Sequence, residues 1–408
     1  MKKLLYLLTI AATALLYSCI DYEDVSRYVN AKVQLQTPDE LANSKGMEGH
    51  AVTMALGSTV LTATTDADGI ATFNDLLPDV YNISTAWSMT KAEYTAITGL
   101  PTTAPGFIVN GALNALPITE DCETSPILLP TTLVEQRDLV ISKIASAGSK
   151  DKNNKSYLYG KYLEIYNQAG DSIDVSGLYI GLLESSNPQP YTLENLKEVY
   201  DDSVVIVKQV FQVPADKPYK IGPGKTLLLT NSATDHSDVN ELEYDLTGAD
   251  FEAKGGPNHV NNPAVTALLN PFTIFSTNPS MILMQGGPCG VIIFRTNENI
   301  DQWPHTYDYG KTSGTLYYLC VPKRLILDGV DYLKNKSTGV DVSSKRLYND
   351  IDAGYINIES ITGYTGEVVY RRTEKVTADG RKILMDTNNS SNDFKVSTTI
   401  KPREYDEN

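Results

Sequence analysis

The sequence has few of the residues from which metal and redox sites are built, with four cysteines and four histidines in 408 residues. No two cysteines have C-x-x-C spacing, no histidines form an H-E-x-x-H pair, and no G-x-S-x-G elbow occurs. We therefore expect no cofactor and no catalytic activity. A hydrolase, or a hydrolase accessory protein, acting on polysaccharide, nucleic acid or protein stays an alternative, because a catalytic triad can assemble from distant positions.

Basic residues are also scarce. The chain has 34 Lys and Arg against 50 Asp and Glu, which gives a formal net charge of −16 at pH 7. Phosphate backbones repel such a chain, so the composition argues against binding to nucleic acid. The charge suits solubility, or the recognition of a basic or metal-bearing partner.

Long apolar runs are missing except at the N-terminus, where Leu4–Leu16 follows two lysines. This run is shorter than the roughly 20 residues of a membrane-spanning helix, and it has the length of a secretory signal. The residues that follow, Leu16-Tyr17-Ser18-Cys19, resemble the lipobox of bacterial lipoproteins. The resemblance implies that 1–18 is a lipoprotein signal peptide and that Cys19 is lipidated, which would anchor the chain to a membrane.

An acidic tether is expected at 19–27. Asp21, Glu23 and Asp24 lie beside the anchor and resemble the acidic surface-export signal of Bacteroidetes lipoproteins. This resemblance implies an outer-membrane protein exposed on the cell surface, and the periplasmic leaflet stays an alternative. Cleavage before Cys19 removes two lysines and changes the net charge from −16 to −18.

Three cysteines remain after lipidation: Cys122, Cys289 and Cys320. The odd number leaves at least one thiol unpaired. A bridge between Cys289 and Cys320 stays open, because the sequence does not give the distance between their Cβ atoms.

Helical periodicity is scarce, and the one short helix that we expect is Leu193–Tyr200. Short β-branched and aromatic runs alternate with Gly, Pro, Asn and Asp clusters, and tyrosine is three times as frequent as phenylalanine, 25 against 8. This composition is typical of strands. We predict an all-β chain with two immunoglobulin-like or transthyretin-like β-sandwich domains in tandem after the signal peptide, at 28–135 and 136–408.

In the first domain, the turn Thr65–Gly69 separates two short strands, and Phe73 follows. Gly69 supplies the positive φ of a tight hairpin, and Phe73 is expected in the core. These residues resemble the transthyretin-like, carboxypeptidase-regulatory sandwich, which implies a scaffold or binding unit. The turn could also begin a calcium loop, but the twelfth position counted from Asp66 is Leu77 instead of Glu, which favours the hairpin.

In the second domain, Lys161–Asn167 alternates with period two and predicts a strand. A polar insert at 148–156 is expected to lack regular structure. Ile173–Ile180, Leu325–Tyr332 and the closing run Val369–Phe394 follow in the order of the lamin-tail signature. The resemblance implies an immunoglobulin-like sandwich with insertions that serves as an interaction module.

The whole chain resembles a family of uncharacterised Bacteroidetes lipoproteins, domain-of-unknown-function family 4876, which pairs these two modules. Members of that family accompany TonB-dependent outer-membrane receptors, so the resemblance implies a receptor protein as the partner. We expect a surface-anchored, non-enzymatic binding or accessory lipoprotein that works beside such a receptor in nutrient capture. An adhesin or fimbria-like subunit is an alternative. The residues do not identify the ligand.

Two further motifs carry weaker signals. Gly222-Pro223-Gly224-Lys225-Thr226 is similar to a phosphate loop, but Tyr219 stands where that loop needs its first glycine, and a strand instead of a helix is expected afterwards. Oxygen-rich side chains near the C-terminus are candidate ligands of a hard cation. They are Asp386, Asn388, Asn389 and Asp393. Turns capped by side chains would explain the same residues.

Overall fold

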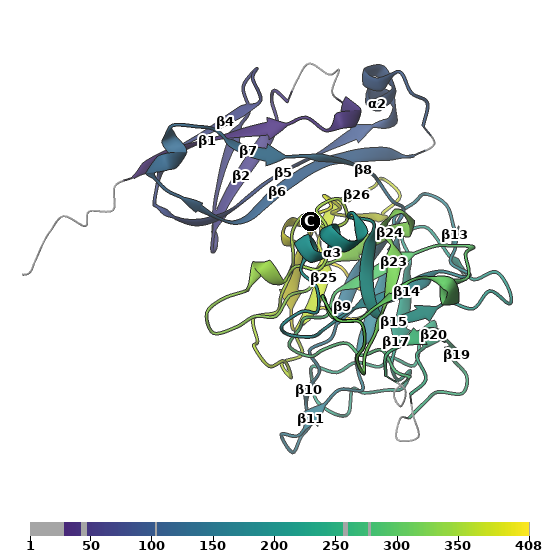
Figure 1. Cartoon of the computed structure of the whole chain (residues 1–408). Helices are drawn as coiled ribbons and strands as arrows, with labels where there is room; N and C mark the ends of the chain where they lie inside the picture. Colours follow the sequence, from purple (N-terminus) through teal and green to yellow (C-terminus); the bar gives the residue numbers. More distant parts are fainter. Residues whose placement is uncertain (1–27, 42–46, 103, 256–259, 276–278, 408) are drawn as a thin grey trace, which may run out of the picture.

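The computed structural model describes residues 28–41, 47–102, 104–255, 260–275 and 279–407. The expected signal peptide, the acidic tether and Cys19 lie outside these residues. Figure 1 shows two β-rich parts, the first drawn in purple to blue and the second in teal to yellow. Strands make up nearly all of the regular structure, which confirms the all-β prediction.

The first part contains two sheets. One has the order β4-β1-β7, with the bounds Ile70–Leu76, Val29–Gln36 and Ile127–Pro130. The other has the order β3-β2-β5-β6-β8, with the bounds Thr59–Thr64, Ala51–Leu56, Asp79–Thr90, Gly106–Ile118 and Thr132–Glu135. The helix α2 (Lys91–Thr98) follows β5. Apolar side chains of both sheets share one core, as in a sandwich.

The predicted tight turn joins β3 to β4, but the hairpin prediction is wrong, because β3 pairs with β2 in one sheet and β4 pairs with β1 in the other. Gly69 has a φ of +73°, and the Asp66 carboxylate accepts hydrogen bonds from the backbone N–H groups of Asp68 and Ile70. This carboxylate therefore closes the turn. Phe73 on β4 is 4 % exposed and lies in the core, as expected.

The second part contains two larger sheets. The first has the order β19-β18-β17-β12-β9-β25-β28, with the bounds Thr266–Ala267, Phe251–Glu252, Thr226–Thr230, Tyr162–Asn167, Leu139–Ala145, Val368–Arg371 and Phe394–Ser397. The second has the order β22-β23-β15-β14-β21-β24, with the bounds His305–Thr306, Tyr318–Pro322, Val204–Gln212, Tyr179–Leu183, Val291–Phe294 and Ile326–Val330. In addition, β20 (Leu269–Thr273) pairs with β15.

Short strand pairs lie around these sheets. They are β10 with β11 (Ser149–Lys150, Ser156–Tyr157), β13 with β16 (Ile173–Asp174, Lys220–Ile221) and β26 with β27 (Thr373–Val376, Lys382–Leu384). The first pair shows that the expectation for 148–156 is wrong. The Asp151 carboxylate accepts hydrogen bonds from the N–H groups of Asn153 and Lys155, so a polar turn is ordered by its own side chain.

The main core of the second part lies between its two large sheets. Leu163 on β12 and Leu182 on β14 both belong to it. A second core covers the other face of the sheet that contains β14 and β15, and the helix α3 (Leu193–Tyr200) contributes Leu196 to it. The helix has the bounds that the sequence predicts.

The two parts meet at β6, as the ribbon also shows (Figure 1). The Asn110 side chain on β6 donates a hydrogen bond to the Asn388 carbonyl at 2.9 Å, and Asn114 donates to the Ala353 carbonyl at 3.1 Å. Strand β8 ends at Glu135 and β9 begins at Leu139. Independent folding of 28–135 and 136–408 stays a prediction.

Candidate binding site

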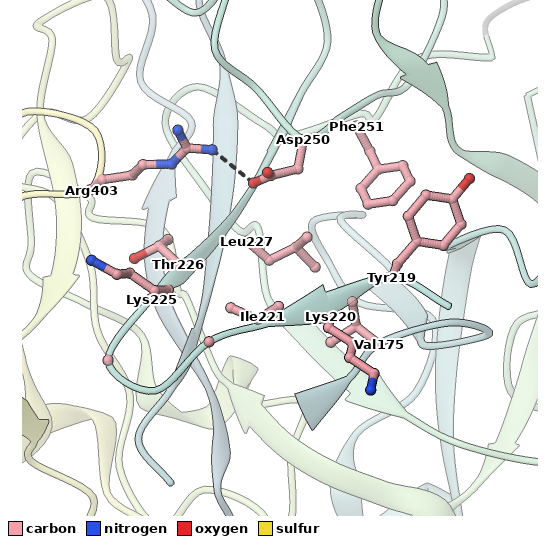
Figure 2. A pocket seen from close by; sticks show the side chains of 12 residues that line it. Val175, Tyr219, Lys220, Ile221, Lys225, Thr226, Leu227, Asp250, Phe251 and Arg403 are labelled. Atoms are coloured by element: carbon pink, nitrogen blue, oxygen red, sulfur yellow. Dashed lines mark hydrogen bonds and ion pairs between the residues drawn. The ribbon is translucent and has the colours of Figure 1, made fainter. Parts of the chain in front are cut away.

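A groove of about 550 Å³ lies beside the turn between β16 and β17. Figure 2 shows Arg403 and Asp250 together on one side of it, and Tyr219 and Phe251 on the other. The groove is lined by Val175, Tyr219, Lys220, Ile221, Gly222, Gly224, Lys225, Thr226, Leu227, Asp250, Phe251 and Arg403. The groove therefore combines basic and aromatic side chains over an apolar floor.

The strand β17 begins at Thr226, immediately after the Gly222–Lys225 turn. Two of the turn's N–H groups are already used, because Gly224 donates to the Asn167 carbonyl and Lys225 donates to the Gly222 carbonyl. A phosphate loop needs free N–H groups and a following helix. The structure thus agrees with the sequence in disfavouring a phosphate loop here.

Gly224 is needed in this turn for two reasons. Its φ is +64°, and a Cβ at this position would lie 2.8 Å from Cγ of Arg381. An L side chain here would be strained and would collide with the arginine. The glycine therefore lets the turn approach β27 and the segment that precedes it.

Arg403 is held in place by two acidic residues. Its side chain donates to Oδ2 of Asp250 at 2.8 Å, and its backbone N–H donates to Oε1 of Glu164 at 2.6 Å. Asp250 also accepts a hydrogen bond from the N–H of Leu228. Both bonds hold Oδ2, and the ion pair with Arg403 favours the charged carboxylate, so Asp250 is placed to orient the arginine and to accept further hydrogen bonds.

The two lysines of the groove are free. Within the described ranges, neither the Lys220 nor the Lys225 ammonium group forms a hydrogen bond or ion pair. Tyr219 is more constrained, because its hydroxyl donates to Asp216 at 3.0 Å and its ring contacts Phe251 edge to face, with centroids 5.0 Å apart. The groove therefore offers two exposed positive charges beside a fixed aromatic ring.

A second groove, of about 510 Å³, continues from the first. The two share Gly224, Lys225 and Arg403. The second adds Arg381, whose Nε is buried with no hydrogen-bond partner among the described residues. The carboxylate of Asp379 lies 3.9 Å from that nitrogen. An unpaired donor at this point leaves capacity for an acceptor from a ligand.

Together the two grooves form a basic surface on an acidic chain. Five basic residues line them, Lys220, Lys225, Arg381, Lys382 and Arg403, against the three carboxylates of Asp250, Asp379 and Glu404. The whole chain, by contrast, carries −16. Such a local reversal of charge concentrates anions at the groove.

A buried ion pair fixes the C-terminal segment that supplies Arg403. The Lys143 ammonium and the Glu164 carboxylate lie 3.1 Å apart, and both side chains are fully buried. The Tyr405 hydroxyl donates to Glu164 at 3.0 Å, and Lys143 donates to the Lys401 carbonyl at 2.7 Å. Burial raises the pKa of Glu164 and lowers that of Lys143, because it disfavours the charged form of each group.

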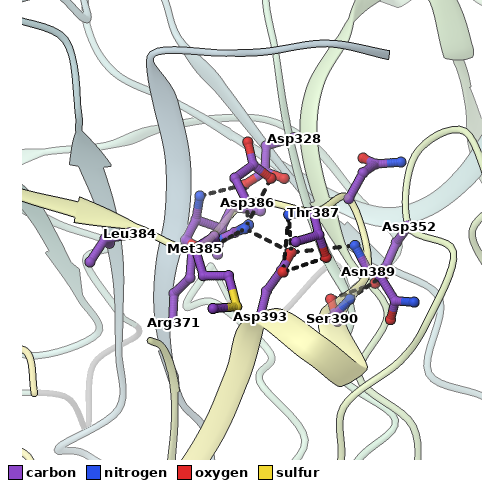
Figure 3. Close-up of polar contacts among 12 residues, drawn as sticks. Asp328, Asp352, Arg371, Leu384, Met385, Asp386, Thr387, Asn389, Ser390 and Asp393 are labelled. Carbon is purple, nitrogen blue, oxygen red and sulfur yellow. Dashed lines mark hydrogen bonds and ion pairs between the residues drawn. The ribbon is translucent and has the colours of Figure 1, made fainter. Parts of the chain in front are cut away.

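The sequence-predicted cation ligands are brought together around an arginine. In Figure 3, Asp386, Asp393 and Asp328 surround Arg371. The guanidinium lies 3.0 Å from Asp328, 3.1 Å from Asp386 and 3.3 Å from Asp393. The cation that these oxygens face is therefore the guanidinium. A metal ion at Asp386, Asn388, Asn389 and Asp393 stays a prediction.

The two asparagines of that set have separate roles. Asn389 caps the short helix α4 (Ser390–Asp393) by accepting from the N–H of Ser391. Asn388 has a φ of +53°, and its carbonyl accepts the hydrogen bond from Asn110. Burial raises the pKa of Asp328 to about 7 and that of Asp393 to about 8, with the nearby Asp386 charge adding to the effect and Arg371 opposing it. Within the described residues, no group of three or more His, Cys, Asp or Glu could hold a metal ion.

The remaining predictions concern the cysteines and the attachment to a membrane. Cys122, Cys289 and Cys320 are all free thiols, so the bridge that the sequence left open is not formed. Cys19, the predicted lipidation site, lies outside the described residues. No helix within the described ranges is long and apolar enough to cross a membrane.

Sequence reasoning missed the basic grooves. Lys217, Lys220 and Lys225 lie within nine positions of one another in a chain dominated by acidic residues, and this local excess of lysine was a usable signal. Arg403 gave no such signal, because it reaches the groove from the far end of the sequence.

Comparison with known proteins identifies one family. Residues 222–401 match the model of a family described as a protein of unknown function, DUF4876. The match agrees with the family resemblance seen in the sequence, and it begins at Gly222 in the turn of the groove.

A solved structure of a DUF4876 family protein has a similar fold. It is the crystal structure of a DUF4876 family protein from Bacteroides thetaiotaomicron VPI-5482, with a TM-score of 0.55 and 19 % sequence identity. The alignment covers 90 % of this chain and 94 % of that chain. At this identity the likeness establishes the fold. The search of curated proteins found no match.

Proposed function

We propose that this chain is a surface-anchored, non-enzymatic binding lipoprotein that takes an anionic ligand into its basic grooves. The observation that carries the proposal is a pair of lysines, Lys220 and Lys225, that have no partner among the described residues and lie beside a fixed tyrosine in a groove of about 550 Å³. On a chain with a net charge of −16, positive side chains that remain unpaired in a concave surface favour a ligand of opposite charge.

The composition of the grooves supports binding in preference to catalysis. Their lining residues include no histidine and no cysteine. The carboxylate of Asp250 is engaged by Arg403 and by a backbone N–H. Acid–base chemistry needs a titratable group within reach of the reacting atoms and free to exchange a proton.

The partner that we propose is an outer-membrane TonB-dependent receptor, with the lipid on Cys19 holding the chain beside it. The support for this part is the lipobox-like sequence and the usual company of the family that the chain resembles. A mature charge of −18 would steer the body toward a basic patch on the receptor, so association should slow as salt rises.

Cross-linking on intact cells, followed by mass spectrometry, tests the proposal. We expect an outer-membrane receptor to be recovered with this chain, and no turnover when the purified protein is incubated with panels of glycans, nucleic acids and peptides. Recovery of no outer-membrane protein, together with measurable turnover of any of these substrates, would favour the enzyme instead.

A further inference from the structure

We propose that the anionic ligand is an acidic oligosaccharide, a chain of sugars that carry carboxylate groups. This inference rests on the proposed binding function and specifies its ligand. It depends on three features of the grooves, which are their continuity, their mixture of charges and their aromatic ring.

The continuity of the grooves favours a chain over a single small anion. Lys220 lies in the first groove, Arg381 lies in the second, and Lys225 and Arg403 line both. Basic groups are thus spread along one concave surface instead of converging on a point. A ligand with repeated negative charges can contact several of them at once, and linked contacts raise the overall affinity.

The mixture of charges favours a sugar chain over a nucleic acid or an acidic peptide. Asp250, Asp379 and Glu404 lie among the basic residues. A chain that offers these carboxylates few neutral donor groups would meet mainly repulsion there. Sugar hydroxyls can instead donate hydrogen bonds to them, while the carboxylate of each acidic sugar pairs with a lysine or arginine.

The aromatic ring adds a contact that sugars use. Tyr219 is fixed by its hydrogen bond to Asp216 and by the ring of Phe251, so little conformational entropy is lost when a ligand packs against it. The apolar face of a sugar ring is suited to a rigid aromatic surface. The Lys217 ammonium group lies 5.1 Å from the centre of this ring, so a sugar that packs against the ring would have a positive charge close to its carboxylate.

Titration calorimetry with short oligogalacturonates tests the inference, with neutral galacto-oligosaccharides of equal length as the uncharged probe. We expect the intact protein to bind the acidic series and not the neutral one, with affinity falling as salt rises. The double variant Lys220→Ala/Lys225→Ala should weaken binding about tenfold, because each exposed ion pair contributes up to about a factor of five.

The control is Lys152→Ala/Lys155→Ala, which removes the same charge from the exposed tip of the β10–β11 hairpin. We expect this control to retain affinity to within about a factor of two, since distant surface charges are screened. Tyr219→Phe should also retain binding, whereas Tyr219→Ala should lose it. Equal losses in the two lysine pairs would overturn the inference, because binding would then follow net charge alone.

Other outcomes separate this inference from the proposed function. If polyglutamate bound as well as oligogalacturonate, the grooves would recognise acidic peptides, and the sugar assignment would fail. If neither probe bound while the receptor was still recovered from cells, the ligand class would be wrong and the receptor proposal would stand. Release of new reducing ends from oligogalacturonate would contradict the non-enzymatic function itself.

Discussion

Replacing Arg371 by methionine should destabilise the second part of the chain severely. Arg371 is 2 % exposed. It donates hydrogen bonds to two backbone carbonyls and to the carboxylates of Asp328, Asp386 and Asp393. It also lies 4.7 Å above the ring of Phe394. Methionine fills part of the same volume but leaves the three acids without their cation.

The expected loss of stability follows from the carboxylates that remain buried after the substitution. Removing one partner of a buried ion pair costs about 3–5 kcal/mol, because the remaining charge is left without compensation. A whole domain is stable by only about 5–15 kcal/mol. The raised pKa values of Asp328 and Asp393 mean that these acids can take up protons, which keeps the cost within that range.

Urea unfolding followed by circular dichroism provides the measurement, with the transition of the second part analysed separately from that of the first. The exposed pair Arg324–Glu298 supplies the control, since Arg324→Met should leave the midpoint nearly unchanged. Arg371→Met combined with Asp386→Asn should recover part of the loss, because the Asp386 carboxylate accepts its hydrogen bond from Arg371. A loss below about 1 kcal/mol for Arg371→Met would refute the reasoning.

Three further predictions concern pH, packing and the anchor. The folded chain keeps protons on Asp328 and Asp393 up to about pH 7 and pH 8, whereas the unfolded chain releases them near pH 3.8. Stability to urea should therefore fall as pH rises through this interval, and Asp328→Asn should flatten the fall. Phe73→Ala and Phe394→Ala, at sites 4 % and 2 % exposed, should each cost about 3–5 kcal/mol in calorimetric unfolding, and a loss under about 1 kcal/mol would place the ring at the surface. Cys19→Ala should release the protein from membranes or leave an unprocessed precursor on a blot, and normal maturation with full membrane retention would contradict lipidation.

Features set by a few neighbouring residues could be predicted from the sequence. The turn at Gly69 needs only a residue that tolerates positive φ and a short polar side chain to close it, whereas the expected pairing of the strands on either side of it is not formed, because they lie in different sheets. The strand β12 and the helix α3 follow from period-two alternation and from a short amphipathic run. In each case the residues that determine the structure lie within about ten positions of one another.

The basic grooves could not be predicted in the same way. Arg403 adopts a φ of +61° because the C-terminal segment is tied down by Tyr405 and by the buried pair Lys143–Glu164. The contacts of Arg403 and Tyr405 with Glu164 join residues more than two hundred positions apart, and local patterns do not reveal them. The oxygen-rich run could be recognised because Asp386 and Asp393 are close in sequence. Its pairing with Arg371 could not, because that residue lies on the separate strand β25.

The guanidinium of Arg371 also affects how the two parts of the chain contact each other. By holding Asp386 and Asp393, it fixes the loop that contains Asn388, whose carbonyl accepts hydrogen bonds from the Ala353 N–H and from the Asn110 side chain. Asn110 is 1 % exposed, so this contact is buried and depends on the loop staying in place. The charge cluster that stabilises the second sandwich therefore also positions the first, and loosening the cluster should loosen the contact between them.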